Sequence, residues 1–222
     1  MFRLFVSTLI ACLPWPLRRW VLNTFYGHKI HRTARLGFCF PAAKHLIMEE
    51  HSYIGNLTVC VHLDLIHLKA HASIGRGNWI TGFPSDGERY FLHQIRRRAE
   101  LILGEHSAIT NRHLIDCSDR VTLGRFTTFA GFRSQILAHT IDLAECRQSA
   151  QPVTIGDYCF VGTDCVLLGG SVLPDYSVLA AKSLLNKPQS EEYTLYGGIP
   201  ARALRSLPKD YRYFTRTTGN VV

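Results

Sequence analysis

The sequence predicts an all-β fold in which the chain winds into a solenoid of short parallel strands with a triangular cross-section. The first observation is a period of six residues, with aliphatic side chains at Ile155, Val161, Leu167, Leu173, Leu179 and Leu185. The second is a small residue at the fifth place of each hexad, at Cys159, Cys165, Ser171, Ser177 and Ser183. A helix repeats every 3.6 residues and a flat strand every two, so a period of six indicates short strands joined by tight corners. Three such sides close a coil of about 18 residues, and equivalent aliphatic side chains then stack into one continuous core.

Composition agrees with a single folded domain. The chain has 222 residues, of which 46% are hydrophobic and 19% are charged. These values exclude an intrinsically disordered chain, a coiled coil and a collagen-like chain. The formal net charge of +8 suits a polyanionic partner. Because the basic residues lack interleaved aromatics or a recognised module, a nucleic-acid partner is not expected.

Residues 1–27 are expected to form an N-terminal helical segment. Apolar residues at helical spacing support this, namely Phe2, Phe5, Val6, Leu9 and Leu13. Three interpretations are open: a signal peptide, a helix that packs over the end of the solenoid, and a helix on a membrane surface with Trp15, Trp20 and the arginines among the headgroups. A signal peptide is disfavoured because Pro and Trp stand where a cleavage site needs small residues. The packing helix is favoured, and no stretch approaches the roughly 20 apolar residues that span a bilayer.

Residues 28–206 are expected to form the solenoid, and residues 207–222 a short C-terminal cap and tail. The period slips by two residues between Ile66 and Leu68 and again between Val121 and Leu123. It breaks at 82–100, which ends in a run of three arginines, and at 135–151. Each break is expected to be an excursion from a corner. The first is either an insertion on the binding face or a solvated loop, and its arginines either attract phosphate or form solvated surface.

The hexads and the segment Tyr196-Gly197-Gly198-Ile199-Pro200-Ala201-Arg202 resemble the hexapeptide-repeat acyltransferases, in particular the maltose and galactoside O-acetyltransferases and the polysaccharide O-acetyltransferases. The resemblance covers residues 28–206 and is most specific over 155–205. It implies a left-handed parallel β-helix, whose hand the spacing alone does not give. It also implies acetyl-CoA as the acyl donor and a homotrimer with the active site between neighbouring subunits.

The second break contains the candidate catalytic residue. In the maltose and galactoside branch, a His-x-x-Asp-like segment precedes a polar loop and a Pro-Ile-x-Ile-Gly restart, and His139 to Asp142 followed by Pro152-Val153-Thr154-Ile155-Gly156 is similar. The resemblance therefore implies that His139 is the general base. Imidazole suits this work because its ordinary pKa lies near neutrality. Asp142 either orients the imidazole or caps the loop turn.

Three further groups of residues carry over from the resemblance. Asp116, 23 residues before His139, matches the acceptor-binding carboxylate of the galactoside branch. An asparagine that the branch places seven residues earlier falls on Ile109, with Asn111 nearby as the substitute contact. For the donor, the resemblance implies that Thr163 and Ala181 contact the pantetheine. It also implies that Asn186, Lys187 and Arg205 contact the nucleotide end of coenzyme A.

Alternatives from other classes are open. In the γ-class carbonic anhydrases, which use the same fold, three histidines bind zinc, and His62 and His67 invite the comparison, with a third ligand from His71, His106 or His113. A non-catalytic scaffold subunit is the other alternative. The acyltransferase is favoured, without a metal, because it accounts for the His139 segment and the C-terminal pattern together. No activated serine or cysteine is required.

The acceptor expected from these residues is a sugar hydroxyl of a surface polysaccharide or its precursor, although the sequence does not distinguish it from an amine or specify the acyl chain. The seven cysteines contain no C-x-x-C pair, which is typical of reduced cysteines and indicates a cytoplasmic protein. The N-terminal segment is an additional candidate for peripheral contact with the cytoplasmic face of a membrane.

Overall fold

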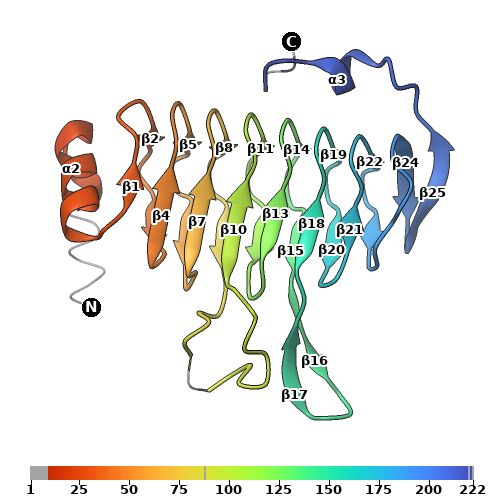
Figure 1. Ribbon diagram of the computed structural model, residues 1–222, viewed down its shortest axis with the longest axis horizontal. Coiled ribbons are helices and arrows are strands. Elements are labelled where there is room, and N and C mark those ends of the chain that lie inside the picture. Colours follow the sequence, from red (N-terminus) through yellow and green to blue (C-terminus); the bar gives the residue numbers. More distant parts are fainter. Residues whose placement is uncertain (1–9, 88, 220, 222) are drawn as a thin grey trace.

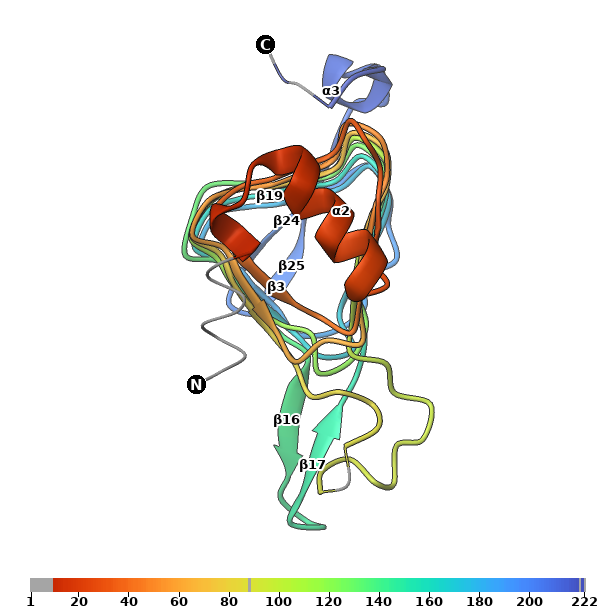
Figure 2. The same ribbon diagram turned by 90° about the vertical axis from the view of Figure 1, so that its left-hand side faces the viewer.

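The chain winds into a triangular prism whose three sides are parallel β-sheets (Figures 1 and 2). The computed structural model describes residues 10–87, 89–219 and 221. We name the sheets A, B and C in the order in which each coil passes through them, and we name each corner by the two sheets that it joins. A corner CA, for example, leads from sheet C into sheet A of the next coil.

Within the described residues, the three sheets contain seven, nine and seven strands. Sheet A consists of β1 (Lys29–Ile30), β4 (His45–Met48), β7 (Leu65–Leu68), β10 (Glu100–Leu103), β13 (Val121–Leu123), β18 (Val153–Ile155) and β21 (Val172–Leu173). Sheet B consists of β2 (Arg35–Leu36), β5 (Tyr53–Ile54), β8 (Ser73–Ile74), β11 (Ala108–Ile109), β14 (Thr128–Phe129), β19 (Phe160–Val161), β22 (Val178–Leu179), β24 (Thr194–Gly198) and β25 (Ala201–Ser206). Sheet C consists of β3 (Phe40–Ala42), β6 (Val59–Val61), β9 (Trp79–Thr81), β12 (Leu114–Asp116), β15 (Gln135–Leu137), β20 (Val166–Leu168) and β23 (Leu184–Leu185).

The hexads place one aliphatic side chain of each side inside the prism. Ile155 pairs with Leu173 and Val161 with Leu179, so one coil contains 18 residues where the repeat is regular. All six aliphatic residues of the clean repeat have an exposed fraction of 0%. The predicted all-β fold, a parallel β-helix, is therefore confirmed.

The slips of two residues have a structural cause in sheet A. Its strands β7 and β13 each direct two side chains inward, Ile66 with Leu68 and Val121 with Leu123, and all four are fully buried. Because side chains alternate along a strand, a second inward residue adds two positions to that side of the coil. The slips therefore belong to longer strands and leave the core continuous.

Helix α2 (Trp15–Phe25) lies across the N-terminal end of the prism (Figures 1 and 2). Its Arg18 is buried and donates hydrogen bonds to the carbonyl oxygens of Leu36, Gly37 and Cys39, which no earlier coil covers. Asn23 exchanges two hydrogen bonds with the backbone of Ile30. The described part of the segment 1–27 thus packs over the end of the solenoid, as favoured from the sequence, while residues 1–9 lie outside the described residues.

The C-terminal tail returns along corner AB. Helix α3 (Arg212–Thr215) buries Phe214 against the rings of Tyr176 and Tyr193. These rings belong to a row of stacked aromatic side chains at corner AB, each with a positive φ: His51, His71, His106, Phe126, Tyr158, Tyr176 and Tyr193. The tail is thereby fixed to the solenoid by ring contacts.

The two excursions differ from expectation in their detail. The first runs from 82 to 99, between β9 and β10. The second begins later than residue 135, because Gln135–Leu137 continue sheet C as β15. It is a β-hairpin of β16 (His139–Asp142) and β17 (Arg147–Ala150) instead of an irregular polar loop.

Candidate active site

Both excursions leave the prism at corner CA and project side by side (Figures 1 and 2). Their origins are adjacent because β9, β12 and β15 are neighbours in sheet C, with Thr81, Asp116 and Leu137 in register. The residues two positions further along are Phe83, Ser118 and His139. Sheet C therefore carries these three side chains to the same corner of three successive coils.

Asp116 and His139 form the polar centre of this corner. The Oδ2 atom of Asp116 lies 2.5 Å from Nδ1 of His139 and also accepts the backbone N–H of His139 at 3.0 Å. Its Oδ1 atom accepts the hydroxyl of Ser118 at 2.5 Å and the Ser118 backbone N–H at 2.9 Å. With four donors, the buried carboxylate is fully satisfied, and its position fixes the imidazole ring.

The charges of the pair depend on each other. Burial works to raise the pKa of the Asp116 carboxyl, but the hydrogen bonds from His139 and Ser118 outweigh it, so the pKa lies below its ordinary value. The hydrogen bond to Asp116 raises the pKa of His139 above its ordinary value, against the lowering effect of partial burial. An imidazole that donates from Nδ1 to a carboxylate carries its lone pair on Nε2 when neutral. That nitrogen is therefore the available base.

The expected role of Asp116 as an acceptor-binding carboxylate does not fit its surroundings. Its exposed fraction is 3%, and both oxygen atoms face His139 and Ser118. Asp142, the other candidate to orient the imidazole, instead accepts the backbone N–H groups of Ala144 and Glu145 in the hairpin turn. The structure thus assigns the turn cap to Asp142 and the contact with the imidazole to Asp116.

An aromatic wall stands beside the imidazole. The rings of Phe83 and Phe91 approach His139 edge-on, with centroids 5.7 and 6.4 Å from its ring, and Tyr90 contacts Phe83. All three aromatic residues come from the excursion 82–99. This excursion therefore supplies the surface against which an acceptor at His139 would lie.

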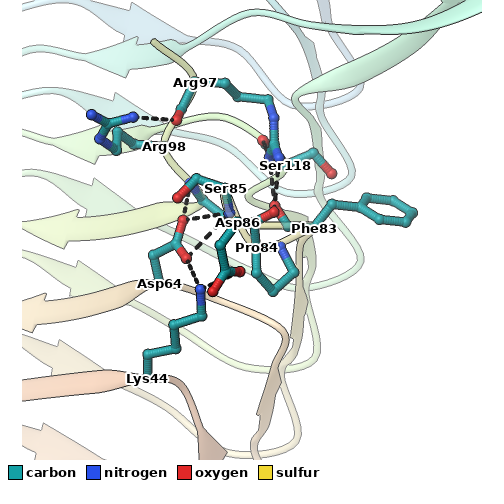
Figure 3. A network of polar contacts seen from close by, with 10 residues as sticks. Lys44, Asp64, Phe83, Pro84, Ser85, Asp86, Arg97, Arg98 and Ser118 are labelled. Carbon is teal, nitrogen blue, oxygen red and sulfur yellow. Dashed lines mark hydrogen bonds and ion pairs between the residues drawn. The ribbon is translucent and has the colours of Figure 1, made fainter. Parts of the chain in front are cut away.

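A network of polar contacts holds the excursion in place (Figure 3). Asp64 accepts the backbone N–H groups of Ser85 and Ala99, near the two ends of the excursion, and pairs with Lys44 at 2.9 Å. Arg97 donates to the carbonyl oxygens of Phe83 and Ser118, and its guanidinium lies 4.4 Å from the centre of the Phe91 ring. The middle arginine of the triplet is therefore a buried support and not the solvated surface that a run of charges predicts.

Gln94 joins the two excursions. Its side-chain amide donates to the carbonyl oxygen of Ala150 and accepts the Ala150 N–H, both at 2.9 Å. Ala150 is the cross-strand partner of His139 in the hairpin. The loop and the hairpin thus form one wall that includes the base.

Comparisons with known proteins agree with this architecture. No family model matches the chain, and no curated protein matches its sequence. Among solved structures, the polysialic acid O-acetyltransferase OatWY is similar with a TM-score of 0.58 and 14% identity, covering 81% of this chain and 84% of its own. This chain has the left-handed β-helix fold of the hexapeptide-repeat acetyltransferases. An acetyltransferase from Vibrio cholerae O1 biovar eltor, VCA0836 in complex with acetyl coenzyme A, is 18% identical with a TM-score of 0.47 and covers 93% of this chain and 90% of its own.

The donor residues implied by the acetyltransferase resemblance lie at separate places in one chain. Thr163 and Ala181 are one coil apart at corner BC. They follow Val161 of β19 and Leu179 of β22 by two residues, and Val161 and Leu179 are paired in sheet B. Asn186 and Lys187 directly follow β23 and therefore leave sheet C at the edge where His139 lies. Arg205 is on β25, the outermost strand of sheet B. One chain thus places Thr163 and Ala181 at the opposite edge of sheet C from His139.

Asn111 lies at corner BC as well, away from Asp116. Its Oδ1 atom accepts the backbone N–H of Arg76 in the preceding coil at 2.8 Å. Asn111 and Asp116 are five residues apart, which is about the length of one side of the coil, so the two residues lie at different corners. Within one chain, Asn111 and His139 therefore lie at different corners, and the acceptor contact of Asn111 stays a prediction.

The histidines considered for zinc do not gather. His67 contacts Glu49, His71 and His106 stack on each other at corner AB, and the buried His113 contacts Thr110. Within residues 10–87, 89–219 and 221, no group of three His, Cys, Asp or Glu side chains is placed to hold a metal ion.

Sequence reasoning missed Ser118, Phe83, Phe91 and Gln94. A signal existed for Ser118, because an aspartate two residues before a serine often accepts that serine's N–H in an Asx turn. No periodic signal marked Phe83, Phe91 or Gln94, since they belong to a loop outside the repeat. Their role depends on the fold of the excursion against corner CA.

Proposed function

We propose that this protein is an acyl-CoA-dependent O-acyltransferase that acetylates a sugar hydroxyl of a surface polysaccharide or its precursor. The observation that carries the proposal is the imidazole of His139, held at Nδ1 by a buried carboxylate and flanked by an aromatic wall. The shared fold with hexapeptide-repeat acetyltransferases supports the same activity. A non-catalytic scaffold has no need for a buried Asp116–His139 pair.

The reaction needs one proton carrier. Nε2 of His139 takes the proton of the acceptor hydroxyl while its oxygen attacks the thioester carbonyl carbon of acetyl-CoA. The tetrahedral intermediate collapses by breaking the carbon–sulfur bond, and the imidazolium returns the proton to the sulfur of coenzyme A. Asp116 stabilises the imidazolium without taking its proton, and a backbone N–H of an adjacent coil stabilises the oxyanion. The buried cysteines take no part, because burial raises the pKa of the Cys159 thiol to about 12.

The aromatic wall supports a sugar acceptor. Carbohydrate rings present C–H groups that pack against aromatic side chains, and the half-buried Phe83 and the exposed Tyr90 offer such rings beside His139. Phe91 is 5% exposed and supports Phe83 from behind. A neighbour with this fold is named as a polysialic acid O-acetyltransferase. Both observations favour a glycan over a small apolar acceptor.

Calorimetric titration with acetyl-CoA tests the donor half of the proposal. The exposed Lys187 and Arg205 should contact the phosphates of coenzyme A. Changing both to alanine should therefore raise the dissociation constant for acetyl-CoA by about tenfold, and the increase should be smaller at higher salt. The matched control changes Lys209 and Arg212 of the tail to alanine and should leave binding within about twofold. Equal affinity of the Lys187→Ala, Arg205→Ala variant and the wild type would exclude contact of these two residues with the phosphates of coenzyme A. Absence of saturable binding to the wild type up to millimolar acetyl-CoA would contradict the proposed function itself.

A homotrimer belongs to the same proposal. Outward side chains of sheet C form a row in register along the prism: Val59, Trp79, Leu114, Gln135, Val166 and Leu184. Trp79 and Leu114 are 53% and 41% exposed, so this row is an apolar surface without a partner in the single chain. Packing a second copy against sheet C would cover it and bring corner BC of one subunit toward corner CA of another.

We also propose that the protein works in the cytoplasm at the membrane surface. The first 48 residues contain seven Arg and Lys residues and no Asp or Glu. On α2 and directly after it, Leu17, Trp20, Phe25 and Tyr26 are 45%, 53%, 69% and 44% exposed. Exposed aromatics beside basic residues suit an interface with anionic lipid headgroups. Among the described residues, the helices are all too short or too polar to cross a bilayer.

Vesicle sedimentation tests this contact. Trp20→Ser with Phe25→Ser should reduce partition onto phosphatidylcholine vesicles containing phosphatidylglycerol by about tenfold, because each serine removes exposed apolar area. Leu92→Ser with Leu143→Ser is the matched control, since those side chains are 66% and 88% exposed on the excursions. Equal partition of both variants, or wild-type partition that does not depend on phosphatidylglycerol, would contradict the membrane contact.

A further inference from the structure

An open cavity of about 500 Å³ lies at the base of the excursion 82–99. Its lining includes Arg96, Arg97, Arg98 and Arg120, together with Gln94 and Asp119. The volume falls within the range of small-molecule sites, about 300 to 1,000 Å³. Nothing in the reaction described above uses this cavity.

The cavity has an excess of positive charge. Asp119 is its one acidic lining residue, and its Oδ1 atom already accepts the backbone N–H groups of Arg98 and Arg120. Arg120 pairs with Glu100 at 2.7 Å, so this guanidinium is partly compensated. The exposed Arg96 has no ion pair or hydrogen bond with the described residues. Its charge is available to a ligand.

A second unsatisfied group lies in the lining. Arg97 is 5% exposed, and its guanidinium nitrogens donate to three backbone carbonyls, but its Nε–H has no partner among the described residues. Figure 3 shows Arg97 and Arg98 extending in opposite directions from the backbone, Arg97 toward Ser118. The buried Arg97 thus adds a fixed positive charge beside the exposed side chains of Arg96 and Arg98.

The cavity is connected to His139 through two residues that line it. Gln94 binds Ala150, which is paired with His139 in the hairpin. Arg97 donates to the carbonyl of Ser118, whose hydroxyl binds Asp116, and it packs on Phe91. One layer of side chains therefore separates the cavity from the site of transfer, so a chain of sugars at His139 could place a neighbouring residue there.

We infer that this cavity binds an acidic group of the acceptor, a carboxylate or a phosphate, and so selects an anionic glycan. The inference rests on the proposed acyltransfer to a glycan and names the class of glycan. Guanidinium groups present paired N–H donors that match carboxylate and phosphate oxygens. A neutral glycan gains less here, because its hydroxyl groups accept hydrogen bonds from a guanidinium but form no ion pair with it.

Calorimetric titration of the full chain with three probes tests the inference: an α2,8-linked sialic acid trimer for the carboxylate, UDP-N-acetylglucosamine for the phosphate, and maltotriose as the neutral probe. The wild type should bind at least one acidic probe more tightly than maltotriose. Arg96→Ala with Arg120→Ala should weaken that binding by about tenfold or more, with the loss shrinking as salt rises. The acidic probe that binds more tightly identifies the group.

Lys209→Ala with Arg212→Ala is the matched control, because it removes two exposed charges from the C-terminal tail, outside the cavity lining. It should leave binding within about twofold. The inference is overturned if the Arg96→Ala, Arg120→Ala variant binds the acidic probe as tightly as the wild type does. It is also overturned if the wild type binds neither acidic probe. Titration of the same samples with acetyl-CoA separates the two proposals. If the wild type binds the acidic probe through these arginines but does not bind acetyl-CoA, the result contradicts the proposed acyltransferase and still supports the anion site.

Discussion

Changing His139 to alanine is expected to lower the rate of acetyl transfer by about a thousandfold, because the acceptor hydroxyl loses the group that takes its proton. The dissociation constant for acetyl-CoA should stay within about twofold, since the base acts on the acceptor. Release of coenzyme A in the presence of an acidic glycan measures the rate. His45→Ala is the control, because His45 is exposed on β4 in sheet A. Retained turnover in His139→Ala would exclude this mechanism.

A second variant keeps the test valid if alanine destabilises the fold. Removal of the imidazole leaves Asp116, which is 3% exposed, with only the two donors of Ser118 and the backbone N–H of residue 139. An ionised carboxylate that loses a donor while buried is costly. His139→Asn retains a donor near Asp116 but has no titratable nitrogen. It should fold with a thermal midpoint close to the wild type and be as inactive as His139→Ala.

The variant Asp116→Asn is expected to change the dependence of kcat/KM on pH. The hydrogen bond to Asp116 raises the pKa of His139, and the imidazole must be neutral to act as a base, so the wild-type rate rises with pH through a pKa above the ordinary value of histidine. Loss of the carboxylate lowers that pKa, so the acid limb of kcat/KM should move to lower pH. The plateau should also fall by about a hundredfold, because an amide no longer selects the tautomer with its lone pair on Nε2. An acid limb in the wild-type position would show that Asp116 does not act on His139.

The coils could be predicted from the sequence because their rule is local. Each aliphatic side chain meets its equivalent one coil later, so a spacing of six records the packing directly, and Leu167 and Leu185 are in contact for that reason. His139 followed from a segment at the point where the repeat stops. Asp116 was found by its spacing of 23 residues, but the contact of its carboxylate with the His139 imidazole was not, since spacing gives proximity but not which atoms meet.

The excursion 82–99 could not be predicted because its conformation depends on distant residues. Asp64 fixes its ends, Ser118 receives Arg97 and Ala150 receives Gln94, across separations of 21 to 56 residues. A run of three arginines is usually solvated, and only the carbonyls of Phe83, Pro84 and Ser118 explain why Arg97 is buried. Contacts of this kind leave no period in the sequence.

The largest effect on assembly is expected from Trp79→Glu with Leu114→Glu. Both side chains point out of sheet C, so the single chain should keep its fold, whereas an ionised carboxylate in a closed interface costs several kcal/mol. Sedimentation equilibrium should show a change from three chains to the single-chain mass of 25.1 kDa. Acetyl transfer should be lost together with the trimer. Tyr53→Glu is the control, since Tyr53 is 40% exposed on sheet B, and a wild type that sediments as one chain would contradict the trimer.

Mixing two inactive variants tests whether each active site contains residues from two subunits. In one subunit His139 and Ala181 lie at opposite edges of sheet C, and in the proposed trimer the His139 of one subunit works with the Ala181 of the next. His139→Ala removes the base, and Ala181→Trp fills the donor corner, so each homotrimer should be inactive. With random mixing in equal amounts, about a quarter of the interfaces in a three-fold ring combine an intact His139 with an intact Ala181. Activity near that fraction of the wild type is expected, and none should return if each chain holds a complete site, because every chain then carries one defect.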